Sequence, residues 1–282
     1  MELIKQNNLY LIFIMESSTT SIILFSVFTL IYIIVKQMLG FKDNKPQIKN
    51  QNIFLGIYGL IILLYQYSLN STLTQELCGV AQPSSAALYT IVPNFFMLGT
   101  LFLLFSYFPG WKAPFSNTVG YVGAMIGGIR GVFNKMMIPL PPLHTAKNLD
   151  EKREMMKSYN INLDTLQIIN QIYKDPSLLI NQFTPQNFND IVEKKQLAGI
   201  FNEKASKYYS KLYTLVTLKD CISEWMWIML TGILVILTSH NALLDISCTK
   251  DTAAMLEKHQ QWEEEQNNAK PPPTPKVYKS RE

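Results

Sequence analysis

Four stretches of the chain lack charged residues and are long enough to cross a bilayer as helices. They are Ser17–Val35, Asn52–Asn70, Ser84–Phe108 and Trp225–Leu244. The first would extend about 28 Å as a helix, close to the thickness of one hydrocarbon core. Soluble core helices seldom remain apolar on every face over this length. The pattern therefore predicts an all-α integral membrane protein with about four transmembrane helices.

The charged stretches between these runs divide the chain into six segments. We expect an N-terminal segment (1–16), three transmembrane helices with short loops (17–108), an elbow with a glycine-rich segment (109–138), a helical lobe outside the membrane (139–221), a fourth transmembrane helix (222–244) and a tail that is helical and then disordered (245–282). Proline, amide and charged residues dominate the end of the tail, and such a composition cannot bury a core.

Lysines in the loops predict the orientation of the chain in the membrane. Those of the first loop are Lys36, Lys42, Lys45 and Lys49. The same loop has only Asp43 as an acid, whereas the loop Ser71–Pro83 carries Glu76 and no basic residue. Because basic loops stay on the cytosolic side, the first loop is predicted to be cytosolic. Alternation then places the lobe in the cytosol, and the N-terminus, the second loop and the tail on the far side.

Cysteines and a glycosylation sequon add little to this outline. Cys78 is expected alone on the far side, while Cys221 and Cys248 flank opposite ends of the fourth span, so we expect no disulfide. The sequon Asn70–Thr72 lies almost at the membrane surface, so we expect it to stay unmodified.

A glycine-rich stretch follows the third span. Its glycines at spacings of three and four are Gly120, Gly123, Gly127 and Gly131. This spacing puts them on one face of a helix, where small residues permit the close approach of a second helix in the bilayer. Arg130 and Lys135 argue against an ordinary fifth span. We expect a re-entrant or interfacial helix packed against the third span or a partner subunit, with a flexible glycine loop as the alternative.

The lobe is expected to be a set of helices joined to the membrane by residues suited to its surface. Short helices are predicted at about 150–159 and 164–174, with helix caps at Asp175 and Thr184, each followed by proline. The stretch 139–143, "PLPPL", favours a stiff spacer over a docking ligand.

Basic and aromatic residues mark the expected membrane interface. Trp111 and Lys112 in the elbow are predicted to lie at the headgroups. A last lobe helix, about 190–219, carries Lys204, Lys207 and Lys211 and is predicted to lie on anionic headgroups, with a solvated charged face as the alternative.

No pattern in the chain predicts catalysis. Phosphate loops, zinc-binding motifs and nucleophile elbows are missing, and His144, His240 and His259 fall in separate regions. Glu224 and His240 lie near the two ends of the fourth span, where we expect them to reach headgroup water. The balance of 25 Lys and Arg against 21 Asp and Glu gives no reason to expect a nucleic-acid partner. We therefore predict a protein that is not an enzyme and has no cofactor or metal.

The segment Tyr107–Tyr121, "YFPGWKAPFSNTVGY", resembles a segment in membrane proteins of nucleocytoplasmic large DNA viruses. In that group a Pro-Gly-Trp follows a transmembrane run, and a Pro-Phe-Ser-Asn-Thr element comes next. The resemblance implies a structural or minor capsid protein of the virion internal membrane, which is assembled from host endoplasmic-reticulum-type membrane. Its implied partners are the lipid bilayer and other membrane or capsid proteins, and it brings no catalytic residues.

Two other classes of function fit the sequence. One is an accessory structural subunit of an organellar membrane complex, which the bias toward Asn, Lys and Ile suits equally well. The other is a small channel, which requires the glycine segment to be re-entrant and to line water.

Overall fold

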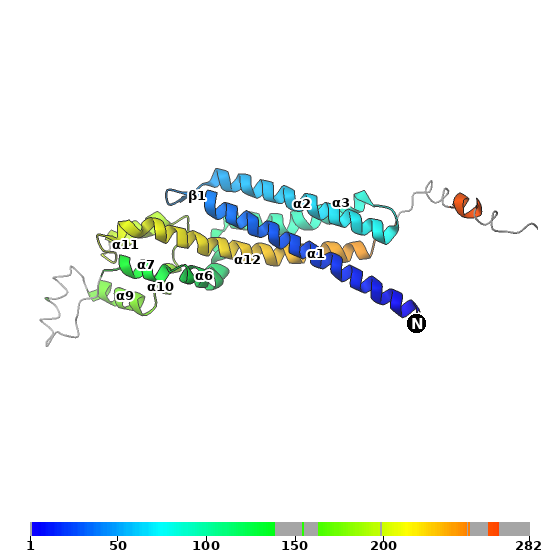
Figure 1. Ribbon diagram of the computed structural model, residues 1–282. Coiled ribbons are helices and arrows are strands. Elements are labelled where there is room, and N and C mark those ends of the chain that lie inside the picture. Colours follow the sequence, from blue (N-terminus) through cyan, green and yellow to red (C-terminus); the bar gives the residue numbers. More distant parts are fainter. Residues whose placement is uncertain are drawn as a thin grey trace, which may run out of the picture.

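Apolar helices run side by side along an elongated bundle, with a lobe of shorter helices at one end (Figure 1). The computed structural model describes residues 2–138, 154, 163–197, 199–246, 248 and 259–264. Among them, four helical stretches are long and apolar enough to span a membrane: Ser18–Leu39, Ile48–Cys78, Pro83–Tyr107 and Ala205–Leu244. The prediction of an all-α protein with about four spans is confirmed, and the helices support an integral membrane protein.

The first two spans, α1 (Glu2–Leu39) and α2 (Ile48–Cys78), are joined by a short hairpin at the lobe end of the bundle. Its strands are β1 (Phe41–Lys42) and β2 (Lys45–Pro46), which pair antiparallel. Asp43 and Asn44 connect them with φ of 52° and 55°. This left-handed backbone at both central residues is what a two-residue hairpin turn requires, and Asp and Asn tolerate it better than most residues.

The third span consists of three helical pieces that follow one another without a break. They are α3 (Pro83–Pro93), the π-helix η1 (Asn94–Gly99) and α4 (Thr100–Tyr107). Proline lacks a backbone N–H, so Pro93 removes one bond from the α-helical ladder, and the wider π-turns follow directly. The span ends at Phe108, where φ of −128° and ψ of 69° leave the helical region.

The glycine-rich stretch forms several short helices instead of one. After η2 (Pro109–Lys112) come α5 (Ala113–Phe115), the π-helix η3 (Ser116–Gly120), α6 (Tyr121–Ile126) and α7 (Ile129–Met136). The chain breaks between α6 and α7 at Gly128, whose φ of 88° suits glycine. The neighbour of η3 and α6 within the chain is the last long helix, α12 (Tyr209–Leu244), whereas we expected the third span or a partner subunit.

Short helices build the described part of the lobe. They are α9 (Leu163–Lys174), α10 (Ser177–Ile180), α11 (Phe188–Leu197) and the 3₁₀ turn η5 (Ala205–Tyr208). The N-cap of α10 is Pro176, one residue after the predicted cap Asp175, and the Asp175 carboxylate accepts a hydrogen bond from the Ser177 N–H at 3.0 Å. The predicted helix at 150–159 and the spacer at 139–143 lie outside the described residues, except residue 154.

The prediction of one basic helix over about 190–219 is wrong. The chain leaves α11 and passes Gly199 with φ of 68°, and Phe201 then forms an isolated bridge with Met137. A new helix, α12, starts at Tyr209 and continues without interruption through the fourth span. Glycine in a left-handed conformation ends a helix readily, whereas nothing interrupts the helical pattern after residue 209.

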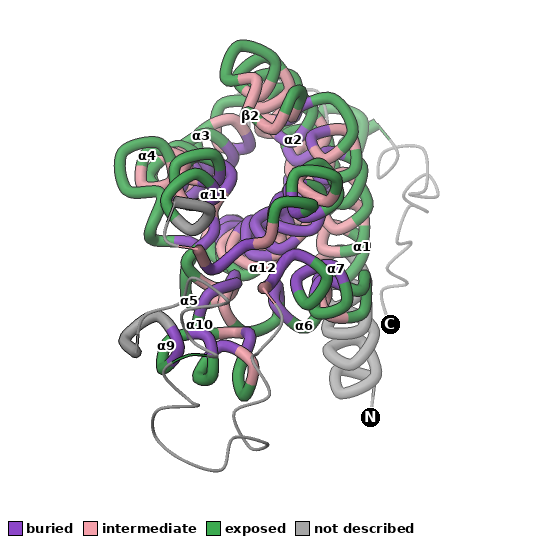
Figure 2. Tube along the Cα trace, turned by 90° about the vertical axis from the view of Figure 1, so that its left-hand side faces the viewer, coloured by how far each residue is buried: buried purple, intermediate pink, exposed green. Residues whose placement is uncertain are grey.

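The described residues form two hydrophobic cores, and α12 contributes to both. In the lobe core, Leu212 and Val216 of α12 pack with α7, α9 and α11. In the bundle core, Ile228 and Val235 pack with the first three spans. Viewed along its length, the molecule has α12 near the centre, and much of this helix is buried (Figure 2).

Candidate functional site: a buried ionic cluster between bundle and lobe

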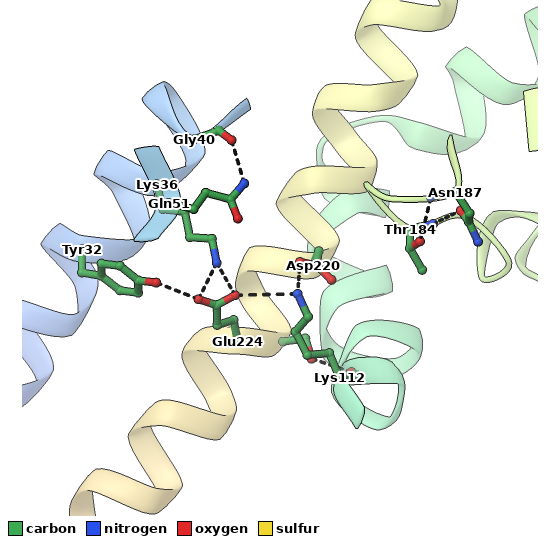
Figure 3. Close-up of polar contacts among 10 residues, drawn as sticks. Tyr32, Lys36, Gly40, Gln51, Lys112, Thr184, Asn187, Asp220 and Glu224 are labelled. Atoms are coloured by element: carbon green, nitrogen blue, oxygen red, sulfur yellow. Dashed lines mark hydrogen bonds and ion pairs between the residues drawn. The ribbon is translucent and has the colours of Figure 1, made fainter. Parts of the chain in front are cut away.

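Two lysine side chains and two carboxylate side chains meet where the bundle joins the lobe (Figure 3). Lys36 of α1 places its Nζ 2.6 Å from both carboxylate oxygens of Glu224 on α12. Lys112, from the elbow, pairs with Asp220 and lies 3.7 Å from Glu224 Oε2. Tyr32 donates its hydroxyl to Glu224 Oε1 at 3.0 Å. We call Lys36, Lys112, Asp220 and Glu224 the ionic cluster.

The sequence places these groups together for simple geometric reasons. Asp220 and Glu224 are four residues apart on α12, so they share one face of the helix. Lys36 stands in the last turn of α1, and Lys112 ends the turn that follows the third span. Both lysines therefore come from the same end of the bundle.

Burial makes the pairing energetically important. The exposed fractions are 8% for Lys36, 5% for Lys112, 6% for Asp220 and 2% for Glu224. Buried ions lose hydration, and a buried pair recovers this loss only when every charge keeps a partner. Two cations face two anions here, so the cluster is electrically balanced, and its contacts fix α1, the elbow and α12 to one another.

The structure gives Lys112 a role different from the predicted headgroup contact. Burial alone would lower the pKa of Lys112, but the carboxylates of Asp220 and Glu224 outweigh it and raise this pKa above the usual value for lysine. The hydroxyl of Ser223 donates to the Lys112 carbonyl at 2.6 Å, so the backbone of the elbow is held as well. Its neighbour Trp111 is 46% exposed and lies with its ring centroid 6.0 Å from that of Trp227.

A third buried lysine, Lys219, ties α12 to the lobe one residue before Asp220. It is only 1% exposed. Its Nζ donates to the carbonyl of Ile180 at 3.2 Å and to Asn117 Oδ1 at 3.3 Å. Ile180 ends α10, and the last carbonyls of a helix favour a cation. Lys219 and the ionic cluster thus anchor two successive turns of α12.

Three of the four predicted packing glycines lie against α12. A Cβ atom added to Gly120 would collide with the Lys219 carbonyl, and one added to Gly123 would collide with the Ile222 side chain. At Gly127 it would lie 2.7 Å from a methyl group of Leu215. An added Cβ at Gly131 would meet no atom within 4 Å.

A further close approach was not predicted from the sequence. The ring of Phe25 on α1 packs directly on Gly232 of α12, and the Phe25 side chain is fully buried. A single glycine inside an apolar run carries no spacing signal, so the sequence alone does not single out Gly232.

The three lysines predicted to lie on headgroups are exposed and belong to the lobe. Lys204 precedes η5, Lys207 lies within it, and Lys211 is in the first turn of α12. The distance along α12 from Lys211 to Glu224 is about 20 Å at the usual helical rise. Because α12 continues straight into the fourth span, this basic stretch extends away from the bundle and does not lie across its end.

Polar side chains also link the spans within the apolar part of the bundle. Thr29 on α1 and Tyr58 on α2 join their hydroxyls at 2.8 Å. The Asn94 amide donates to Gln66 Oε1 at 2.5 Å and so joins the third span to α2. Hydrogen bonds between helices help to hold spans together where lipid offers no hydrophobic driving force.

A third polar contact lies nearer the opposite end of the bundle. The Asn70 amide donates to Thr90 Oγ1 at 2.7 Å and to Ser239 Oγ at 2.9 Å. The sequon asparagine therefore takes part in packing between helices. His240 is 7% exposed, and its Nε2 has no hydrogen-bond partner among the described residues. Our expectation that Glu224 and His240 reach headgroup water is wrong, because both are buried.

The expectation of no disulfide is also wrong. Cys78, at the end of α2, is bonded to Cys248 beyond the end of α12, with the Cα atoms 5.4 Å apart. The predicted alternation of the spans places both cysteines on the far side of the membrane, and this shared side is the signal in the sequence for their pairing. Cys221 itself is buried and unpaired.

The ionic cluster also has a signal in the sequence. Asp220 and Glu224 precede the fourth span, whereas Lys36 and Lys112 follow the first and third spans. All four were therefore predicted at the same membrane surface, and opposite charges there favour pairing. In the part of the chain that the structure describes, no group of three or more His, Cys, Asp or Glu residues could hold a metal ion. Comparison of the chain with protein-family models, curated proteins and solved structures found no match.

Proposed function

We propose that this protein is a structural membrane protein of a large DNA virus particle that links the internal membrane to capsid or core proteins. The observation that carries the proposal is the continuity of α12, which contributes Leu212 and Val216 to the lobe core and Ile228 and Val235 to the bundle core. A lobe held in this way has a fixed position relative to the bilayer, and so does any protein that binds to the lobe. The ionic cluster supports this role because it fixes the elbow and α1 to the same helix.

The viral part of the proposal is supported by the resemblance of Tyr107–Tyr121. This segment contains the elbow with Lys112, and its last residues begin the packing against α12. The contacts give the segment a structural purpose, because it turns the chain from the third span onto the fourth.

Two independent features support an orientation for the link. Lysines of the hairpin and the lobe gather at one end, which favours the cytosolic side. The disulfide between Cys78 and Cys248 lies at the other end, and disulfides persist in oxidising compartments such as the lumen of the endoplasmic reticulum. We infer that the lobe faces the cytosol, where capsid and core proteins assemble.

Purified virions test the proposal. We expect mass spectrometry to find the chain among the proteins that detergent extracts from the membrane of the purified virions. We expect amine cross-linking of intact particles to join the exposed lysines Lys204, Lys207 or Lys211 to a capsid or core protein. Absence of the chain from the particles, or its recovery in a complex of an organellar membrane, would overturn the viral assignment. The channel alternative gains no support from the glycine segment, because three of its glycines pack against α12.

A further inference from the structure

A groove and a pocket meet on the outside of the bundle, between α1 and α12. The groove has a volume of about 390 Å³ and an apolar lining that includes Leu30, Ile34, Met38, Leu218, Ile222 and Trp225. We call it the outer groove. Leu30, Ile34 and Met38 are 51%, 49% and 71% exposed. Because these residues belong to a membrane-spanning helix, the outer groove opens toward lipid.

A polar pocket continues the outer groove toward the lobe. It has a volume of about 230 Å³ and is lined by residues that include Lys42, Asp43, Tyr213 and Thr217. We call it the head pocket. Gln37 and Met38 line both spaces, so the two are contiguous. The groove extends from Leu30 to Met38, about 12 Å along the helix, and the head pocket follows it at the hairpin.

Buried polar atoms without partners belong to residues around these spaces. Gln37 Oε1, the Tyr213 hydroxyl and Trp225 Nε1 have no hydrogen-bond partner among the described residues. Gln37 lines both spaces, Tyr213 lines the head pocket, and Trp225 lines the outer groove. An unpaired buried donor or acceptor costs about 1–3 kcal/mol, so a ligand that satisfies these atoms after small side-chain adjustments gains affinity.

The charges of the head pocket select the class of headgroup. Lys42 and Asp43 are both exposed and adjacent in the hairpin, so the pocket presents one cation and one anion. Lys36 and Glu224, which lie nearby, are already paired with each other. A headgroup with both a phosphate and a primary ammonium group complements this arrangement, because a primary ammonium can donate hydrogen bonds to the Asp43 carboxylate and a quaternary ammonium cannot. A headgroup that is only anionic would leave Asp43 opposed to it.

We propose that the outer groove and the head pocket together bind one phospholipid of the cytosolic leaflet with a zwitterionic, primary-amine headgroup. The acyl chain lies in the outer groove. The phosphate faces Lys42, and the ammonium group faces Asp43. Tyr213 and Trp225 supply donors for phosphate and ester oxygens, while Gln37 supplies an acceptor. This site does not depend on the proposed viral role, because it rests on the surface where α1 and the hairpin meet α12. Only its assignment to the cytosolic leaflet rests on the orientation inferred above.

Native mass spectrometry of the full chain, released from nanodiscs with defined lipids, tests the site. Phosphatidylethanolamine, phosphatidylcholine and phosphatidylglycerol with identical acyl chains are compared. We expect one retained lipid per chain, with phosphatidylethanolamine favoured several-fold over the other two. Equal retention of the three lipids would overturn the headgroup assignment, and no retained lipid would overturn the site.

Matched variants locate the lipid. Leu218→Trp fills the outer groove and should abolish the adduct, whereas Leu234→Trp, at an exposed apolar position of α12 that does not line the groove, should leave it intact. Ile34→Trp fills the groove from the α1 side. It provides an independent test if Leu218→Trp does not fold. Persistence of the adduct in the folded groove variants contradicts the proposal.

A final variant separates the headgroup from the chain. Asp43→Asn preserves the left-handed turn, which asparagine tolerates, and removes only the charge. It should keep the adduct but bring the retention of phosphatidylethanolamine and phosphatidylcholine to the same level. An unchanged preference would show that Asp43 does not face the ammonium group.

Discussion

The bundle and the lobe have opposite distributions of polar and apolar residues. On the bundle, large apolar side chains face outward, among them Leu64 at 60% and Phe95 at 69% exposure, while Gln66 and Asn94 are buried and bonded to each other. In the lobe, Phe133 and Phe183 are fully buried, and exposed lysines lie outside. One chain therefore contains two regions built for different solvents.

The difference shows which force holds each region together. Water drives the apolar residues of the lobe inward, because burying their surface is favourable there. Lipid is as apolar as the side chains of the bundle, so that force is weak between the spans, and close packing with hydrogen bonds takes its place. The packing of Phe25 on Gly232 and the contact between Asn94 and Gln66 are examples.

The two regions meet on α12 between Lys219 and Glu224. Before this point α12 packs in the lobe core, and after it α12 packs in the bundle core. From Glu224 to Leu244 the helix extends about 30 Å, the thickness of a hydrocarbon core. The ionic cluster therefore lies at the boundary between water and lipid, where charges can be buried within protein without entering the hydrocarbon.

The largest expected effect comes from breaking the cluster. Glu224→Leu leaves Lys36 buried without a counter-ion, so we expect a loss of about 3–5 kcal/mol in the free energy of unfolding. Chemical unfolding of the protein in lipid nanodiscs measures it. The double variant Lys36→Leu/Glu224→Leu removes both charges and should recover most of the loss. A double variant as unstable as Glu224→Leu alone would show that the pairing is not what stabilises this junction.

A matched pair of lysine substitutions tests whether the surface of the bundle faces lipid and the surface of the lobe faces water. Leu234 on the bundle and Leu178 on the lobe are 51% and 52% exposed. Leu234→Lys places a charge in hydrocarbon and should cost about 2.5–3.5 kcal/mol. Leu178→Lys faces water and should change stability by about 0.5 kcal/mol or less. Unfolding in nanodiscs compares the two, and equal effects would contradict the assignment of lipid and water to these surfaces.

A smaller effect is expected from the glycine contacts that join the regions. Gly120→Leu drives a side chain into the backbone of α12 at Lys219 and should cost about 1–3 kcal/mol. Gly131→Leu is the control, because nothing lies within 4 Å of its added Cβ. Thermal unfolding of both variants measures the loss of stability caused by each substitution. If Gly131→Leu were the more harmful of the two, the packing of η3 on α12 would not be important for stability.

The sequence predicted the spans well because length and the absence of charge are properties of each segment alone. The end of the third span at Phe108 was predictable for the same reason, since Pro109 and Gly110 are local signals. The sequence did not predict that the expected basic helix, about 190–219, is interrupted at Gly199, because a single glycine inside a helical pattern is ambiguous.

Contacts between distant segments were harder to predict. Lys36 and Lys112 were interpreted as surface charges, since their partners Asp220 and Glu224 lie more than a hundred residues further along the chain. The spacing of Gly120, Gly123 and Gly127 indicated a packed face but not the helix that it meets. Cys78 and Cys248 can pair only because the two chain segments that carry them end close together. The predicted topology indicates on which side of the membrane each segment ends, but not how close the two ends are.

The distance between lobe and bundle tests most directly whether α12 fixes one to the other. Spin labels at Leu178→Cys in the lobe and Leu88→Cys in the bundle, on a chain with Cys221→Ser, report this distance by pulsed electron paramagnetic resonance in nanodiscs. We predict one narrow distance distribution, which becomes broad when Glu224→Leu is added. A broad or multiple distribution in the chain with intact Glu224 would contradict a lobe held to the membrane through α12 and the ionic cluster.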